Sequence, residues 1–500
     1  MSEELRSALN RVIEAGYQVS ADGFEFLQTL PPVDLESTIS DALSKAGSNK
    51  DDILFFDREF FASCRIEKEE KSKVFSGKGG VRPLAAEYDS DLKFLSEPGE
   101  ASTGDLDGFI DYFRSRFDQL DRILRRRMDM KDAINIKACE KMPLKSKIKV
   151  IGLVTDKRGS GNRLFIELED SENSITVMTS DQETVRKGLT LLKDQIICVE
   201  GVKYKQDLII ANDFIWPDIP ATNPKRADVP LCTAYLADIH VGSIHFEREM
   251  FCRFVDWLNL NVGNNNSQLL ASKVKYVVIA GDLVDGIGIY PNQMDELNIT
   301  DIREQYEEAA RLLADIPDYI EIIITPGNHD AVRRSLPQPA IPEDYAKTLF
   351  NDSRVHLLEN PCSIQLHGVE SYIGHGKALD EILSSVPGMD FHSPEKGVEL
   401  LLQCRHLAPI YGSSTPIAPE PQDRLVIPRA PDVIHMGHIH VHGIRKYKGT
   451  TIIASGGWQA QTPFQKRVNL TPDVGMAPIL DLQSHQVSTV NFNGASNRGQ

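Results

Sequence analysis

The sequence predicts an α/β fold in which a large C-terminal domain follows a small β-barrel and a helical N-terminal region. From about Val229 onward, apolar runs typical of buried strands alternate with helical patterns at residues 246–258 and 302–316. Residues 143–217 instead carry five short stretches in which apolar and polar residues alternate, as they do in strands with one buried face. Helical spacing of apolar residues dominates the region before them. These three patterns define the order of the domains.

The length and composition of the chain indicate a protein of several domains. Its 500 residues exceed what one core usually organises. No apolar run is long enough to cross a bilayer, and the charged amphipathic start differs from a signal peptide. The seven cysteines are scattered without a CxxC pair, which favours a reducing, cytoplasmic location. A net charge of −17 argues against binding nucleic acid by overall charge, so any contact with DNA has to be local, metal-mediated or shared with another subunit.

Residues 1–142 contain three segments of different character. Helical patterns over residues 1–64 indicate a small helical module, for which a simple bundle and a docking module are both open. Residues 65–104 are rich in charge, glycine and serine, and we assign them to a flexible linker. Residues 105–142 are an amphipathic helical connector. Its main helix, from about Leu106 to Met128, carries an apolar stripe of Phe109, Phe113, Phe117 and Leu120. Three arginines near its end, Arg125, Arg126 and Arg127, suit either the helix C-terminus or a phosphate contact.

Residues 143–217 are predicted to form an OB-type barrel. A helix-like stretch lies between the third and fourth of the five alternating stretches, which indicates that barrel class. Such barrels often bind single strands by stacking bases on aromatic side chains. Here the aromatic residues are few, chiefly Phe165, Tyr204 and Phe214. Packing against protein is therefore favoured over binding to DNA.

The domain at residues 229–484 carries five short motifs, each directly after a predicted strand, and residues 485–500 are assigned to a tail. The motifs are LADIH, AGDLVD, PGNHD, GHG and MGHIH. They supply eight candidate ligand side chains: Asp238, His240, Asp282, Asn328, His329, His375, His438 and His440. Because chemistry in α/β sheets gathers at the carboxyl ends of strands, these side chains are expected to meet. Each motif alone occurs readily by chance, whereas all five in this order are highly specific.

The residue types indicate two divalent metal ions. Strand side chains alternate, so Asp238 and His240 leave on the same side and can hold one ion together. The carboxylate of Asp282 has two oxygens and can bridge two cations, and Asn328 adds a neutral carbonyl oxygen. This mixture of imidazole and oxygen ligands makes Mn²⁺ the first expectation, with Fe, Zn or Mg as alternatives.

The sequence around the motifs resembles known families. Residues 231–460 resemble the calcineurin-like metallophosphoesterases, which implies a metallophosphoesterase sandwich for this α/β domain. Three segments are similar to the small subunits of archaeal D-family DNA polymerases. They are HLAPIYGSSTPIAPEPQDRLVIPRAPDVIHMGHIHVHG, GGWQAQTPFQKRVN and MAPILDL. That resemblance extends over about residues 147–482, and the barrel has the same place in that family.

This resemblance implies a proofreading 3′→5′ exonuclease that acts on DNA 3′ ends in the cytoplasm, at the nucleoid. The implied partner is a large polymerising subunit, in a heterodimer or a larger complex, and polymerase activity is expected only in that complex. One implied metal site consists of Asp238, His240, Asp282 and His440. The other consists of Asp282, Asn328, His375 and His438, with Asp282 bridging the two. His329 is implied as the catalytic histidine beside the leaving group.

Other interpretations stay open. A free-standing repair nuclease or phosphodiesterase would use the same chemistry, although the barrel argues against a plain phosphatase. A catalytically weak scaffold subunit is the third interpretation, against which the complete ligand set argues. The proline-rich segment at residues 409–431 either covers the site or contacts a partner, or it is a rigid surface loop.

A few side chains near the motifs are expected to be structural. Asp285 and Asp330 are expected to orient the ligands rather than to bind metal. Cysteine packs readily in apolar surroundings, so three cysteines are expected to be buried: Cys232, Cys362 and Cys404.

Overall fold

The computed structural model describes residues 81–96, 99 and 104–493, together with residues 9, 12, 17–28, 39 and 55–56. The chain forms two compact units, Met1–Arg82 and Pro83–Gln500. In the described part of the chain, no helix has both the length and the apolar character that crossing a bilayer requires.

The described part of the first unit is mixed rather than purely helical. Strand β1 (Gln18–Val19) pairs in parallel with β2 (Phe55–Phe56), and α2 (Ala21–Gln28) follows β1 directly. Strands of two residues are too short to show an alternating pattern, which is why the sequence did not predict them. Residues 9, 12 and 39 are helical, and Val12 and Ile39 are buried, while most of the remaining module predicted for residues 1–64 lies outside the described residues.

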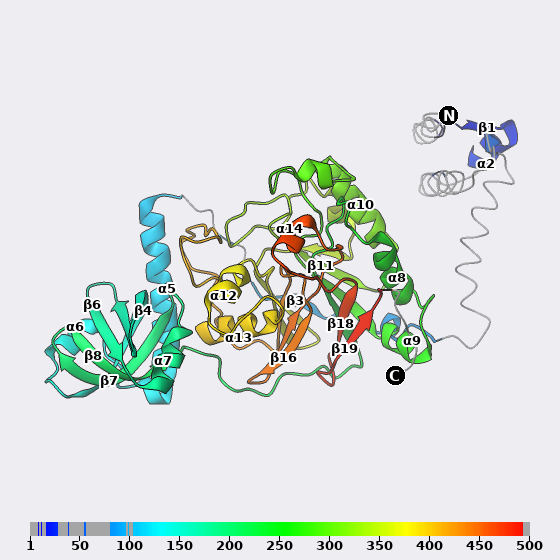
Figure 1. Ribbon diagram of the computed structural model, residues 1–500. Coiled ribbons are helices and arrows are strands. Elements are labelled where there is room, and N and C mark those ends of the chain that lie inside the picture. The colour runs from blue at the N-terminus through cyan, green and yellow to red at the C-terminus, as the bar shows by residue number, and fades with distance from the viewer. Residues whose placement is uncertain are drawn as a thin grey trace. The chain divides into compact units, whose positions relative to one another are not determined.

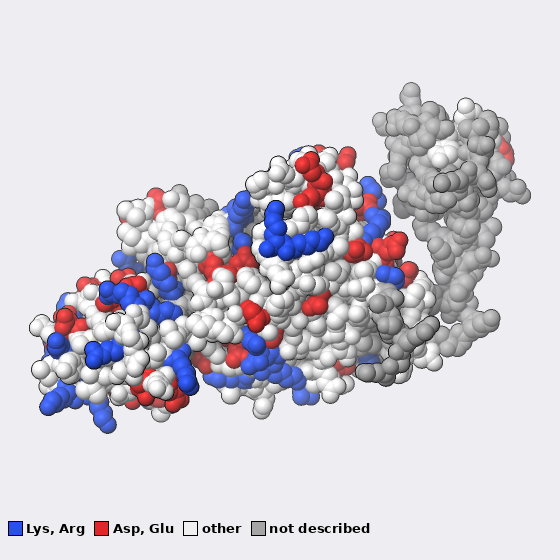
Figure 2. Space-filling model, in the orientation of Figure 1, with Lys and Arg blue, Asp and Glu red and all other residues white. Residues whose placement is uncertain are grey.

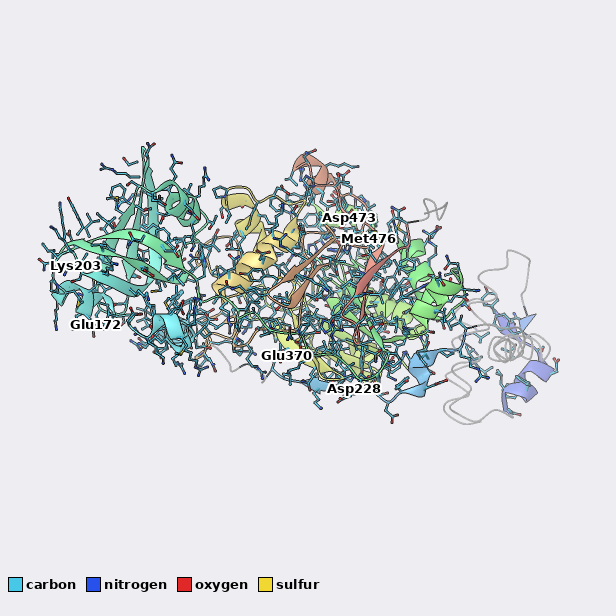
Figure 3. All side chains as sticks on the ribbon, turned by 90° about the horizontal axis from the view of Figure 1, so that it is seen from below. Glu172, Lys203, Asp228, Glu370, Asp473 and Met476 are labelled. Atoms are coloured by element: carbon cyan, nitrogen blue, oxygen red, sulfur yellow. The ribbon has the colours of Figure 1, made fainter. Side chains whose placement is uncertain are left out.

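The barrel in the second unit is confirmed as a closed sheet of five strands. Its order is β4-β5-β6-β8-β7, and the helix α7 follows the third strand as predicted. The elements are β4 (Lys147–Ser160), β5 (Arg163–Glu169), β6 (Ser174–Thr179), α7 (Gln182–Leu189), β7 (Ile196–Lys205) and β8 (Leu208–Ile215). The buried Lys203 of β7, labelled in Figure 3, donates from Nζ to the carbonyl oxygen of Cys139 at 2.8 Å. The OB class of this barrel remains a prediction.

The connector ahead of the barrel is helical, but its buried stripe differs from the prediction. It contains α5 (Leu106–Arg126), η3 (Met128–Met130) and α6 (Ile136–Lys141). The buried side chains of α5 are Tyr112, Arg116, Leu120 and Leu124, whereas Phe109, Phe113 and Phe117 are only half-buried. The helix turns a charged residue inward because Arg116 finds a buried carboxylate, Asp423, at 2.7 Å. Hydrophobic spacing alone could not predict that partner.

The three arginines at the end of α5 have different surroundings. Arg125 forms a salt bridge with Asp121, and Arg127 forms one with Asp129. Arg127 also donates to the carbonyl oxygen of Trp216 at 3.0 Å. Two of the three arginines therefore pair with aspartates of the connector, and the choice between the helix end and a phosphate contact stays open.

The α/β domain consists of two facing sheets of six strands each. The first sheet has the order β12 (Val355–Leu357), β11 (Glu321–Thr325), β10 (Val274–Ala280), β9 (Cys232–Leu236), β18 (Met476–Asp481) and β19 (Val487–Asn491). The second has the order β16 (Gly443–Tyr447), β17 (Thr450–Ala454), β15 (Val433–Met436), β14 (Val369–Ile373), β13 (Cys362–Leu366) and β3 (Leu92–Phe94). Buried side chains from both sheets form one core between them, for example Tyr276 and Val278 with Ile364 and Val433.

Helices cover the outer face of each sheet, as Figure 1 shows. The first sheet packs against α8 (Arg248–Leu258), α9 (Asn265–Ala271), α10 (Ile302–Ala314) and α11 (Lys347–Asn351). The second packs against α12 (Leu379–Ser385) and α13 (Pro394–Cys404). The remaining elements of this unit are the short helices η2 (Leu84–Glu87), η4 (Gln293–Glu296) and α14 (Pro463–Arg467). The three cysteines predicted to pack in the core, Cys232, Cys362 and Cys404, are buried and free.

Two predicted boundaries are wrong. Within the linker assigned to residues 65–104, Leu92–Phe94 is strand β3, which pairs with β13, and Ala85 is buried in the core between the sheets. Within the tail assigned to residues 485–500, Val487–Asn491 is strand β19, which pairs with β18. Both strands lie at a sheet edge, where polar residues are common, so the sequence shows no apolar run there. Residues 65–80 and 494–500 lie outside the described residues.

The proline-rich segment at residues 409–431 is packed into the domain rather than exposed as a simple loop. Leu336, which follows the PGNHD motif, donates its N–H to the carbonyl oxygen of Pro416 at 2.9 Å and accepts from the N–H of Ala418 at 2.8 Å. Arg333 in the same loop donates to Glu420 at 2.5 Å. The segment therefore supports the loop that carries Asn328 and His329.

Candidate metal centre

The five motifs meet at the carboxyl ends of neighbouring parallel strands. Strands β9, β10 and β11 are parallel neighbours in the first sheet, and β14 and β15 are parallel neighbours in the second. Three groups of potential ligand atoms, each lying within 4.8 Å of one another, are found among the described residues: a first of Asp238, His240 and His440, a second of Asp282, His375 and His438, and a third of His240, Asp285 and His329. The structure thus brings together the side chains that the motifs singled out.

The first group brings three potential ligand atoms face to face. His240 Nδ1 lies 3.0 Å from Asp285 Oδ1, so in a neutral ring this nitrogen is the donor and Nε2 presents a lone pair. That Nε2 lies 3.2 Å from His440 Nε2. Asp238 Oδ1 is 3.6 Å from the same His440 atom and, among the described residues, is buried without a hydrogen-bond partner. A cation at this point would satisfy all three side chains.

The second group shares its carboxylate with the first. Asp282 Oδ2 lies 3.3 Å from His375 Nε2 and 3.8 Å from His240 Nε2, so one oxygen faces a ring from each group. Asn328 Oδ1 is 3.0 Å from the same His375 nitrogen. His375 Nδ1 lies 2.9 Å from the carbonyl oxygen of Ala280, which leaves Nε2 as the ligand atom of a neutral ring.

His438 is oriented by a carboxylate that the sequence did not reveal. Asp380 of α12 accepts at Oδ2 from His438 Nε2 at 2.9 Å and is paired with Lys377 at 2.6 Å. In a neutral ring this contact leaves Nδ1 as the nitrogen of His438 that could bind a metal. Asp380 follows no strand and belongs to no motif, so its role depends on how α12 packs and had no signal in the sequence.

His329 stands beside both groups. Its ring is nearly perpendicular to that of His240, with the centroids 4.7 Å apart. Nδ1 lies 2.7 Å from the carbonyl oxygen of Asp285, so Nε2 is the nitrogen left for a substrate. The N–H of His329 donates to Asp282 Oδ1 at 2.8 Å, which fixes the loop against the shared carboxylate.

Asp285 and Asp330 hold the ligands in place. Asp285 accepts from Gln459 at 3.0 Å and from Gln293 at 2.8 Å in addition to orienting His240. Asp330 accepts from the N–H of Gly327 at 2.8 Å and from the hydroxyl of Tyr306 at 3.0 Å. The two carboxylates therefore orient the site, and the glutamines that complete this network were missed by the sequence analysis.

Backbone conformation and close packing mark the site as well. Five residues of the two groups have a left-handed backbone with φ between 52° and 71°: Asp238, His240, Asp282, His438 and His440. Residues other than glycine adopt this conformation rarely, and strain of this kind gathers at functional sites. A Cβ atom at Gly327 would lie 2.1 Å from Asp282 Oδ1, so only glycine leaves room for the shared carboxylate.

Burial and opposite charges set the protonation of the side chains. Burial raises the pKa of Asp238 to about 7. Burial also opposes ionisation of Asp282, but His375 and the neighbouring histidines hold its pKa well below the usual value. For His240 and His375, burial favours the neutral ring, yet the nearby carboxylates raise the pKa of each to about 9. The other three histidines of the site behave differently, because burial lowers the pKa of His329, His438 and His440 and favours their neutral rings.

Comparisons with known proteins place these features in context. The sequence profile of the family that comprises the B subunits of DNA polymerases alpha and epsilon matches residues 235–442, which include all five motifs. The DNA polymerase II small subunit of Methanothermobacter thermautotrophicus is 41% identical over 407 residues, which cover 80% of this chain and 83% of the relative. That of Archaeoglobus fulgidus is 42% identical over 374 residues, or 74% of each chain. That of Pyrococcus horikoshii is 39% identical over 401 residues, and this chain spans 64% of its length.

Proposed function

The chain belongs to the family of archaeal DNA polymerase II small subunits, and from this premise we propose that it is the proofreading 3′→5′ exonuclease subunit of a two-subunit replicative DNA polymerase. The observation that supports a live enzyme most strongly is the shared position of Asp282 Oδ2, 3.3 Å from one ligand group and 3.8 Å from the other. A scaffold would not need a buried carboxylate between two sets of histidines, because buried charge is costly unless it is paired or binds a metal.

We propose two divalent ions, Mn²⁺ first, at the two groups. Asp238, His240 and His440 would hold one ion, and His375, His438 and Asn328 would hold the other, with Asp282 available to both. When bound, such ions supply Lewis-acid activation of water and neutralise charge on the scissile phosphate.

The remaining steps belong to the side chains of the chain. Asp285 and Asp380 keep His240 and His438 in fixed orientations, so little reorganisation is needed when substrate arrives. His329 has Nε2 available for the substrate, and a ring that carries a proton at this atom would donate it to the leaving 3′ oxygen or stabilise the charge there. The products are a nucleoside monophosphate and a DNA strand shortened by one nucleotide.

A nuclease assay tests this proposal. The full chain is incubated with matched and mismatched 3′ ends, with and without Mn²⁺, alone and together with its large subunit. We expect Mn²⁺-dependent shortening that is faster at mismatched ends. Asp238→Ala and His440→Ala should abolish shortening while the circular dichroism spectrum stays that of the wild type. Full activity in these variants would rule out this site.

The same preparation separates the alternatives. Bis-p-nitrophenyl phosphate reports phosphodiesterase chemistry without DNA, and its hydrolysis would exclude a purely structural subunit. We propose that affinity capture of the chain recovers a large polymerase subunit. Robust DNA cleavage without such a partner would instead favour a free-standing repair nuclease.

A further inference from the structure

A surface segment between β17 and β18 is attached directly to the first ligand group. Trp458 donates its backbone N–H to the carbonyl oxygen of Asp238 at 2.8 Å. Asp473, labelled in Figure 3, donates its N–H to the carbonyl oxygen of His440 at the same distance and accepts at Oδ2 from the N–H of His442 at 2.9 Å. Both ends of the segment are thus fixed to metal-site residues or their neighbours.

The short helix α14 (Pro463–Arg467) in this segment is fixed to His440 by Gln465. The side-chain oxygen of Gln465 accepts from the N–H of Thr462 at 3.0 Å, which completes a capping box. The side-chain nitrogen of the same buried residue lies 3.2 Å from His440 Nδ1. One side chain therefore positions α14 relative to the metal site.

The rest of α14 faces solvent with an unusual combination of side chains. Phe464, adjacent to Gln465, is 60% exposed, and Val468 just after the helix is 54% exposed. Lys466 and Arg467 lie between them, also exposed, and form no salt bridge with another described residue. Figure 2 shows lysine or arginine side chains gathered where Figure 1 places α14. An aromatic ring and two exposed cations thus stand within two residues of a contact with a metal-site histidine.

We propose that α14 is a platform for the DNA strand next to the scissile phosphate. Phe464 stacks on a nucleobase, and Lys466 and Arg467 contact backbone phosphates. Proteins bind single strands by stacking bases on aromatic rings and by contacting the backbone with cations. Stacking tolerates any sequence, because every base has a face that can stack. The inference rests on the proposed exonuclease function and adds the group that positions its substrate.

Position favours DNA over a protein partner as the occupant of α14. A scissile phosphate at the ligand groups brings its neighbouring nucleotides next to residues attached to His440. The net charge of −17 makes two adjacent, exposed cations noteworthy, since DNA contact on such a protein has to be local. A docking surface for protein at this place would compete with the substrate.

The test compares DNA with a substrate that has no base. Two quantities are measured for the full chain with Mn²⁺, alone and with the large subunit. They are kcat/KM on a single-stranded 3′ end and the rate on bis-p-nitrophenyl phosphate, and the first is divided by the second. Phe464→Ala should lower this ratio about tenfold, mainly through KM, as loss of base–aromatic stacking does. Phe464→Trp should restore it, and Lys466→Gln with Arg467→Gln should weaken the salt dependence of KM.

Phe350→Ala is the matched control. Phe350 is 56% exposed on α11, which precedes the edge strand β12 and carries none of the proposed ligands. Its ratio should equal that of the wild type. An unchanged ratio in Phe464→Ala, with both substrates cleaved, would overturn the platform. The platform would also be overturned if Phe464→Ala no longer captured the large subunit while its ratio stayed that of the wild type. That result would make α14 a protein interface. If the wild type cleaves neither substrate, the exonuclease proposal fails first.

Discussion

Asp282 is the residue on which both ligand groups depend. It is buried, its Oδ1 accepts from the N–H of His329, and its Oδ2 faces His240 and His375. Asp282→Asn keeps the size of the side chain but removes the negative charge between the two groups. We expect it to lower exonuclease activity by at least about 100-fold and to reduce bound Mn²⁺, because a metal-bridging carboxylate offsets the repulsion between cations. Metal content and activity measured on the same preparation check this, and unchanged metal content would contradict it.

Asp380 provides a test of orientation at a residue that is not expected to bind metal. Asp380→Asn weakens the hydrogen bond that fixes His438, so we expect the Mn²⁺ concentration for half-maximal activity to rise roughly 10- to 100-fold. The exposed Asp390, which lies beyond α12, serves as a control in Asp390→Asn. Saturating Mn²⁺ should recover much of the activity lost in Asp380→Asn. Equal metal dependence in both variants would show that Asp380 does not position His438.

Residue types and motif order were enough to predict all seven proposed ligands and His329, because each follows a strand whose apolar run is visible in the sequence. The residues that orient them were only partly predictable. Asp285 and Asp330 lie within two motifs, whereas Asp380, Gln459 and Gln465 reach the site by tertiary packing. No local pattern marks a residue whose partner is distant in the chain.

At the scale of elements, α5 is held to the α/β domain by a buried ion pair. Arg116 donates to Asp423 at 2.7 Å and to the carbonyl oxygen of Pro409 at 2.8 Å, and His406 Nε2 lies 2.8 Å from the same carboxylate. Burial opposes ionisation of Asp423, but His406 and Arg116 hold its pKa well below the usual value. Removing one partner of such a pair leaves an uncompensated buried charge.

Asp423→Asn should therefore lower the free energy of unfolding at pH 7 by roughly 3–5 kcal/mol. Because the folded pKa of Asp423 lies below its unfolded value of about 3.9, the pair stabilises the fold fully above that pH. This contribution is lost as the pH falls below about 4, so the difference between wild type and variant should shrink there. Urea unfolding from pH 7 to pH 3 measures it, with Asp118→Asn on the exposed face of α5 as the control. A difference independent of pH would contradict this account.

At the scale of the whole molecule, the barrel is expected to pack against protein rather than to bind DNA. Of its three main aromatic residues, Phe214 is buried, Phe165 is half-buried and only Tyr204 is largely exposed, at 54%. A single exposed ring offers no continuous platform for stacked bases. Tyr204→Ala should change the affinity of the full chain for a single-stranded oligonucleotide by less than about twofold, as measured by fluorescence anisotropy. A larger loss would make the barrel a DNA-binding module.

The order of barrel and α/β domain was predictable because strand and helix periodicities differ over long stretches. The domain edges were not. Strands β3 and β19 complete the two sheets from segments assigned to a linker and a tail, where they pair with β13 and β18. The burial of Arg116 could not be predicted either, because it depends on the ion pair with Asp423, which is distant in the sequence. The pairing of β3 and the ion pair of Arg116 join residues that are far apart in the chain, whereas β19 is a short strand next to its partner that lacks an apolar run.

The most direct test of the metal centre is anomalous diffraction from crystals of the chain grown with Mn²⁺. We expect two anomalous peaks roughly 4 Å apart, one on each side of the Asp282 carboxylate, with His329 close to both. A single peak, or peaks away from these side chains, would contradict it.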